Sequence, residues 1–288
     1  MSTTGLGAPG ERKRAARRLV IGAVIAFVVI FALAAVVAVA LNGDNGGESG
    51  APAAAAPVAE GTGTPAPTTT TGSQPSPAGW DVAAENALAA RPMVQFSVEA
   101  AQPHNLATHS AGPPIALPAS TVRTGPVPQG FPHTPEGALA QLKALDEAGM
   151  VGLDPAAYTL AYQQLALPGA PDVANVGLVQ VAASARLAGG AEPTGPLTGL
   201  TSTFQVDAGL IKGVADGGNF VVPCVLGELS VISPKSTARA GVGDCQALRW
   251  VDGTWRISPT SLPNNAPSAW PGTEEAVTAG YRGVSGNA

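Results

Sequence analysis

The residues of this chain with side chains suited to chemistry are two cysteines, three histidines and a few carboxylates in strand-like segments. A turn centred on Pro234 and Lys235 would place Cys224 directly opposite Cys245 on neighbouring strands. We therefore predict a cross-strand disulfide, which closes a loop of about 20 residues and stabilises the fold by roughly 3 kcal/mol. The chain has no Cys-x-x-Cys pair, so its sequence does not indicate a redox or metal role for these cysteines.

The histidines do not follow the pattern of a metal site. His104 and His109 are separated by four residues in a proline-rich stretch, a spacing that does not place both on one helix face. No acidic cluster accompanies them in the sequence. His133 directly precedes a helix cap, where we expect a solvent-exposed side chain. The sequence therefore predicts no metal site.

Three carboxylates lie in strand-like segments, at Asp207, Glu228 and Asp244. We expect Asp207 to point outward, and Glu228 is the one to test for a raised pKa, although pairing with Arg249 or Arg256 is the favoured interpretation. The chain contains no Gly-x-Ser-x-Gly elbow, phosphate loop or dinucleotide-binding glycine pattern. We predict no catalytic residue and no cofactor.

The uncharged run 19–41 is the segment that would place the rest of the chain relative to a membrane. Its length suffices for a membrane helix, which needs roughly 20 apolar residues. Basic residues fill the preceding tail 1–18 and only Asp44 and Glu48 follow closely, so the positive-inside rule places the tail in the cytoplasm and the rest outside. We expect a single-pass cell-membrane protein bound to the lipid bilayer through 19–41. A cleaved signal peptide is the alternative.

Composition limits the partners and the domains. A formal net charge of −5 with 12% charged residues predicts no nucleic-acid partner. Residues 42–79 are rich in Gly, Ala, Pro and Thr, which predicts a disordered linker. Residues 80–133 are expected to form an irregular N-terminal extension, with a short helix at 82–90 and a short strand at 93–98.

Regular structure is expected over 134–259. Cap and proline signals predict helices that begin after Thr134, Asp154 and Pro171. The apolar spacing predicts that the third helix, ending at Gly189, has an inward face of Val173, Val176, Val179, Ala183 and Leu187. After Thr203 the pattern alternates, which predicts a strand whose inward face is Phe204, Val206, Ala208 and Leu210.

The clearest local signal is a hairpin with Asp252 and Gly253 at its turn. Its register predicts one face that packs on the helices, formed by Leu248, Trp250, Trp255 and Ile257. The other face, formed by Arg249, Val251, Thr254 and Arg256, is expected to be largely wet because two unpaired arginines cannot both be buried.

The last segment, 260–288, is expected to be a tail with a short helix that Thr273 caps and that runs through Tyr281. Trp270 precedes this cap, where an aromatic side chain usually packs onto the domain as a staple. The alternative is an anchor for a partner protein, because tryptophan and tyrosine are frequent in protein interfaces. The candidate interface residues are Trp270, Tyr281, Arg249 and Arg256.

Three helices followed by a curved antiparallel sheet and a Trp-rich Asp-Gly hairpin resemble the cone-shaped fold of nuclear transport factor 2, over 134–259, with 248–257 as its motif. The segments 130–139 and 266–272 resemble uncharacterised single-span actinobacterial proteins, which are similar to components of conjugative elements. The layout resembles the assembly factors of type IV secretion and conjugation machines. It departs from them in its longer linker and in the added segment 80–133.

The resemblance implies an α+β protein with one transmembrane helix, a linker and an NTF2-like cone. It implies a non-enzymatic extracytoplasmic scaffold that docks envelope protein partners of a conjugation or secretion apparatus, and it leaves the oligomeric state open. The alternative is a small-molecule-binding protein or hydrolase that uses the cone interior. That alternative predicts a closed-ended pocket with at least two convergent polar groups.

Overall fold

The computed structural model describes residues 79–234, 236–260 and 262–286. The predicted tail 1–18, the predicted span 19–41 and nearly all of the predicted linker 42–79 lie outside these residues. Within the described ranges, no helix is long and apolar enough to cross a membrane.

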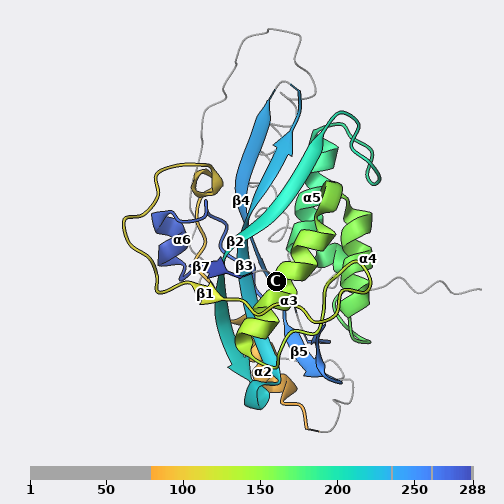
Figure 1. Ribbon diagram of the computed structural model, residues 1–288, viewed down its shortest axis with the longest axis vertical. Helices are drawn as coiled ribbons and strands as arrows, with labels where there is room; N and C mark the ends of the chain where they lie inside the picture. The colour runs from red at the N-terminus through yellow and green to blue at the C-terminus, as the bar shows by residue number, and fades with distance from the viewer. Residues whose placement is uncertain (1–78, 235, 261, 287–288) are drawn as a thin grey trace, which may run out of the picture.

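The described residues form a mixed α+β structure around one curved sheet (Figure 1). The strand order is β1-β7-β2-β3-β5-β6, and β4 also pairs with β3. β1 and β7 are parallel, while the other named pairs are antiparallel. The strands are β1 (Ile115–Ala116), β2 (Thr201–Ala215), β3 (Phe220–Ile232), β4 (Thr237–Cys245), β5 (Leu248–Val251), β6 (Thr254–Ile257) and β7 (Arg282–Ser285).

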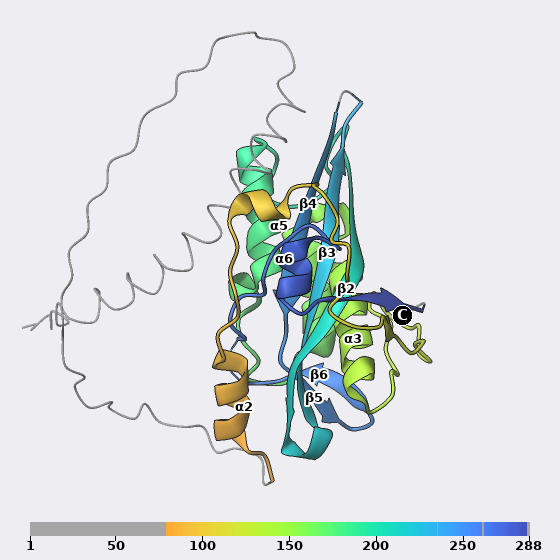
Figure 2. The ribbon, with the colours of Figure 1, turned by 90° about the vertical axis from the view of Figure 1, so that its left-hand side faces the viewer.

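Helices cover both faces of this sheet. α3, α4 and α5 lie along one side of the long strands and α6 lies on the other (Figure 1). Figure 2 shows α2 and α3 on opposite sides of the same strands. The sheet therefore separates two apolar clusters, which we call the helix-side core and the outer core. The helices are α2 (Val82–Ala90), α3 (Pro135–Gly149), α4 (Pro155–Leu165), α5 (Gly177–Ala188) and α6 (Glu274–Thr278).

The predicted caps are confirmed at the first two helices of the domain. The Thr134 side chain accepts a hydrogen bond from Gly137 N, and Pro135 occupies the first turn of α3. Asp154 caps α4 in the same way, by accepting from Ala156 N. The predicted helix at 82–90 is also confirmed as α2.

The third helix begins later than predicted. Asp172 caps the short 3-10 turn η3 (Val173–Asn175), and α5 starts only at Gly177. The interruption changes which side of the helix faces the core, so Leu178 and Ala182 are fully buried. The predicted inward positions Ala183 and Leu187 are wrong, because both are exposed and Leu187 is 82% exposed.

The two predicted hairpin registers are confirmed. Cys224 pairs with Cys245 across β3 and β4, and Trp250 pairs with Trp255 across β5 and β6. Gly253 has a φ of +79° in the connecting turn, a conformation that glycine adopts at little cost. Trp255 is fully buried against the helix-side core, as the hairpin face predicted.

The predicted inward face of the 204–210 strand is only half right. The register of β2 against β3 shifts between Val206 and Ala208, which marks a bulge at Asp207. A bulge adds one residue and reverses the alternation of side chains beyond it. Phe204 and Val206 therefore pack in the helix-side core, whereas Ala208 and Leu210 pack in the outer core.

The two ends of the described chain differ most from expectation. The predicted strand at 93–98 is absent, and this stretch is irregular up to the 3-10 turn η1 (Val98–Ala101). Tyr281 lies beyond α6, and the next residues form β7, which pairs with β2 and β1. The segment expected to be a tail thus supplies a strand to the sheet.

Candidate functional site

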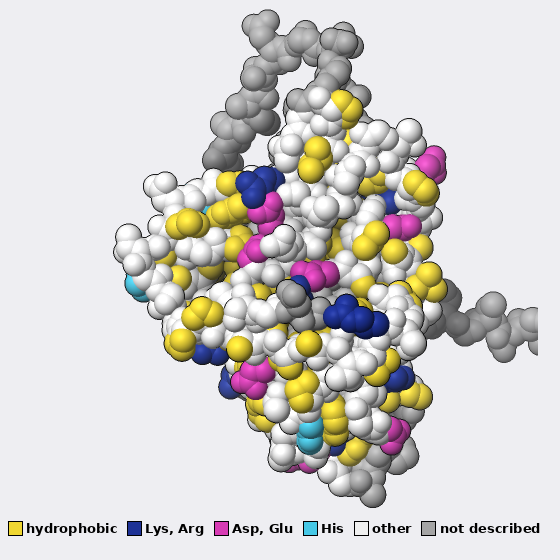
Figure 3. All heavy atoms as spheres, in the orientation of Figure 1, with side chains coloured by type: hydrophobic (Ala, Val, Ile, Leu, Met, Phe, Trp, Pro, Cys, Tyr) yellow, Lys and Arg dark blue, Asp and Glu magenta, His cyan; other side chains and the backbone are white. Residues whose placement is uncertain are grey.

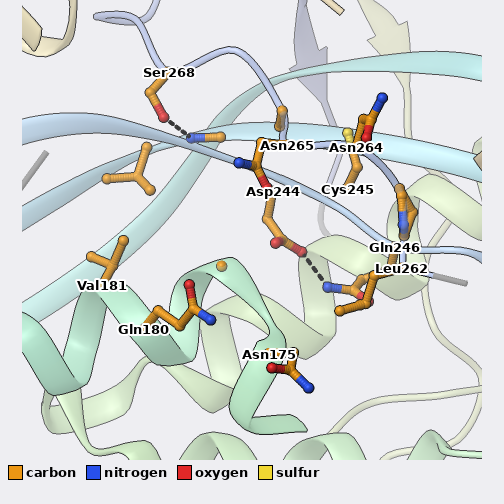
Figure 4. A pocket seen from close by; sticks show the side chains of 15 residues that line it. Asn175, Gln180, Val181, Asp244, Cys245, Gln246, Leu262, Asn264, Asn265 and Ser268 are labelled. Atoms are coloured by element: carbon orange, nitrogen blue, oxygen red, sulfur yellow. Dashed lines mark hydrogen bonds between the residues drawn. The ribbon is translucent and has the colours of Figure 1, made fainter. Parts of the chain in front are cut away.

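A pocket of about 130 Å³ lies between β4, α5 and the segment 262–268. Figure 4 shows the Asp244 side chain pointing from its strand toward α5, on which Gln180 lies. The polar side chains that line the pocket are Asn175, Gln180, Asp244, Gln246, Asn264, Asn265 and Ser268. These groups converge from three separate segments of the chain.

Asp244 is the titratable group of this pocket. It is 5% exposed, and burial raises the pKa of its carboxyl group to about 6. Gln246 Nε2 donates a hydrogen bond of 2.8 Å to Asp244 Oδ2, which opposes this rise in pKa. Sequence reasoning assigned no role to Asp244. Its alternation with buried Val242 on β4 is the signal that would have placed it on the inward face.

A second buried carboxyl group lies in the same core. Asp146 of α3 is fully buried, and Tyr158 donates a hydrogen bond of 2.7 Å to its Oδ1. Burial raises the pKa of Asp146 well above its ordinary value, and the charge of Asp244 raises it further. The charge of Asp244 therefore favours protonation of Asp146.

Glu228, the carboxylate singled out to test for a raised pKa, has a lowered pKa. Arg239 Nε and Nη2 donate to its two carboxylate oxygens at 2.6 and 2.5 Å, and these bonds lower the pKa of Glu228. The predicted pairing with Arg249 or Arg256 is wrong, because the neighbouring strand supplies Arg239 instead. Burial raises the pKa of Asp207, which sits at the bulge.

The expected wet face of the last hairpin is wrong at Arg249. This side chain is 3% exposed and forms ion pairs with Glu85 and Asp216. Its guanidinium also lies 3.8 Å from the centre of the Trp80 ring. Burial raises the pKa of Glu85, and the charge of Arg249 opposes that rise. Arg249 is thus enclosed and does not present a docking surface, while Arg256 is half-buried and stays a predicted interface residue.

A second hollow, of about 460 Å³, lies beside Trp270 and α6. Trp270 is half-buried, and the Arg239 guanidinium lies 4.9 Å from the centre of its ring. Tyr281, a candidate interface residue, is 3% exposed, donates to Pro267 O and lines the hollow. Figure 3 shows hydrophobic side chains gathered over the region of α6, with acidic side chains beside them.

The fold brings acids to the two loop histidines, contrary to expectation. His104 Nε2 lies 3.0 Å from a Glu275 carboxylate oxygen, and His109 Nε2 lies 3.6 Å from one of Glu274. The Gln102 carbonyl and then Glu275 raise the pKa of His104. His133 is exposed, as expected, and stacks on Trp250. In the part of the chain that the structure describes, no group of three His, Cys, Asp or Glu side chains could hold a metal ion.

The predicted disulfide is confirmed, with a Cα–Cα distance of 4.1 Å between Cys224 and Cys245. Together with the curved sheet, it defines the described region as a disulfide-bonded α+β domain. Scans of the chain against protein-family models, curated proteins and solved structures each found no match.

Proposed function

We propose that this protein is a non-enzymatic, single-pass membrane component whose extracytoplasmic domain docks envelope proteins of a conjugation or secretion apparatus. The apolar run 19–41 and the charges on either side of it support the anchor and its orientation. The disulfide supports an oxidising location for the domain. The proposal also assigns the α+β fold of residues 134–259 to the NTF2-like cone class.

The hollow beside Trp270 is the observation that carries the docking proposal. Its walls combine apolar side chains with the carboxylates of Asp207 and Glu228. Leu106 at its rim is 65% exposed, and a large apolar side chain at that exposure gains free energy when a partner covers it. Arg239 pairs with Glu228, whereas Asp207 accepts a hydrogen bond from Gln205 and forms no ion pair among the described residues, so Asp207 is the acid that a basic partner can pair with. The partner that fits is a protein segment with an apolar side chain next to a basic one.

Site-specific photo-crosslinking in the native membrane tests this function. A photoreactive residue replaces Leu106 in the full-length chain, and the matched control replaces Leu160 on α4, which is also 65% exposed. We expect position 106 to yield adducts with an envelope protein and position 160 to yield none. Equal labelling from both positions, or no adduct from position 106, would contradict the proposed docking face.

The orientation of the chain is checked in the same cells. Protease added from outside should digest the domain while the cytoplasmic proteins stay intact, because the proposal places everything after residue 41 outside. A domain that survives in intact cells and is digested only after lysis would reject the topology. A mature domain released into the medium would support the signal-peptide alternative instead of the anchor.

A further inference from the structure

The pocket at Asp244 is separate from the docking hollow and has an unusual charge pattern. The titratable groups that interact with Asp244 are Asp146 from α3, Tyr158 and Tyr162 from α4, and Tyr281 between α6 and β7. All four are acids. None of the groups that shift the pKa of Asp244 is a cation, so the described residues leave this buried carboxylate without a positive partner.

Gln246 contributes an unpaired hydrogen-bond acceptor to the same pocket. This side chain is 1% exposed and donates its Nε2 to Asp244. Its Oε1 is buried and has no hydrogen-bond partner among the described residues. A buried acceptor without a donor costs about 1–3 kcal/mol. The Asp244 carboxylate already accepts hydrogen bonds from Gln246 Nε2 and the Cys245 backbone, so it lacks only a positive partner. The Gln246 Oε1 atom lacks a donor.

The rest of the pocket limits the size and shape of a ligand. Apolar side chains line it as well, from Val181 on α5, Val242 on β4, and Leu262 and Ala266 in the segment 262–268. Its volume of about 130 Å³ is close to that of a cavity of roughly 150 Å³ that holds benzene. A molecule with a few carbon atoms fits this space, and its apolar part would contact these side chains.

We propose that this pocket binds a small organic cation, namely a primary ammonium ion on a short alkyl chain. The ammonium group supplies positive charge to Asp244 and a hydrogen bond to Gln246 Oε1. An ammonium has three donors and no acceptor, which matches the carboxylate of Asp244 and the unpaired Oε1 of Gln246. The inference does not depend on the docking function, because it uses a different surface of the domain.

Calorimetric titration of the full-length chain in lipid nanodiscs tests the site, with empty nanodiscs as the blank. The probe is n-butylammonium, and 1-butanol is the uncharged control of the same chain length. We expect n-butylammonium to bind at least tenfold more tightly than 1-butanol. Below pH 6 its binding should release protons from Asp244, which appears as a dependence of the heat on the buffer.

Two substitutions locate the binding. Asp244→Asn keeps the shape of the side chain and removes its charge, so we expect a folded protein with at least a tenfold loss of n-butylammonium affinity. The matched control, Asp252→Asn, lies in the exposed turn of the last hairpin and should bind like the parent. Equal affinity of the parent for the two probes, no binding of n-butylammonium, or full affinity in Asp244→Asn would each overturn the proposal.

Discussion

The two faces of the sheet bury carboxylates in opposite ways. On the helix side, Asp146 and Asp244 are buried together, and burial raises the pKa of both. On the outer side, Arg249 is buried between Glu85 and Asp216 and stacks on Trp80. The buried carboxyl groups of the helix side thus favour the protonated form, whereas those of the outer side pair with a buried cation.

The difference follows from where the covering segments come from. α3, α4 and α5 are consecutive in the chain, and their apolar faces cover the helix side. Polar contacts accompany this burial, such as the hydrogen bond from Val206 N to Glu147 Oε1. The outer face is covered by α2 from one end of the described chain and by the segment 262–286 from the other. Lys212 Nζ donates to Ala89 O at 2.8 Å and Arg249 pairs with Glu85, so directional contacts attach α2 to the sheet. Distant segments are held here by specific polar links.

Removal of the buried cation should have the largest effect. Arg249→Ala leaves two carboxylates without their partner, and such a loss lowers the free energy of unfolding by about 3–5 kcal/mol. Denaturant unfolding followed by circular dichroism measures the change. The control is Arg239→Ala, which breaks the more exposed pair with Glu228 on the same sheet and should cost far less. Similar losses in the two variants would show that the outer face does not depend on the enclosed cation.

Loss of the disulfide should come next. The bond joins residues 21 positions apart in the outer core. Replacement of both Cys224 and Cys245 by alanine should lower the free energy of unfolding by roughly 3 kcal/mol. A reducing agent should bring the parent to the same stability and leave the double variant unchanged. If reduction left the stability of the parent unchanged, the disulfide would not contribute to the stability of the outer face.

The smallest effect is a pH dependence from the helix side. The folded-state pKa of Asp244 is about 6, above the ordinary value of 3.8, so the folded protein binds this proton more tightly than the unfolded chain. The stability from that proton is present at low pH and is lost as pH rises through 6, by about 1 kcal/mol between pH 5 and pH 7. Asp146, with its pKa shifted the same way, adds to the loss.

Thermal unfolding across this pH range measures the effect. Asp244→Asn should reduce the fall in stability between pH 5 and pH 7 to the part that Asp146 contributes, whereas Asp252→Asn should follow the parent. Superimposed profiles for the parent and Asp244→Asn would mean that the acid does not titrate in the folded core.

Local signals predicted the elements whose determinants are close in sequence. Thr134 with Pro135, and Asp154 with Pro155, supply both the cap and the first helical turn, so the starts of α3 and α4 follow from a few neighbouring residues. A two-residue turn fixes the pairing of a hairpin, which is why the disulfide and the Trp250–Trp255 pair were predicted correctly.

Most features of the candidate sites could not be predicted from the sequence. The bulge at Asp207 reverses the faces of β2, and no residue type at that position signals an added residue. The partner of Glu228 was misassigned because the facing strand, and not the charge pattern, brings Arg239 to it. Trp270 was named as an interface residue from its type alone, and the hollow beside it needed α6 and β2 to come together.

The sequence by itself determined the starts of α3 and α4, the hairpin registers and the cysteine pair, because each depends on backbone geometry over a few residues. Only the tertiary structure decided that Arg249 is enclosed, that β7 joins the sheet and that Asp244 lines a pocket. Those outcomes depend on contacts between segments far apart in the chain, such as Arg249 with Glu85. Burial and pairing of a charge are properties of such contacts, and neighbouring residues in the sequence do not encode them.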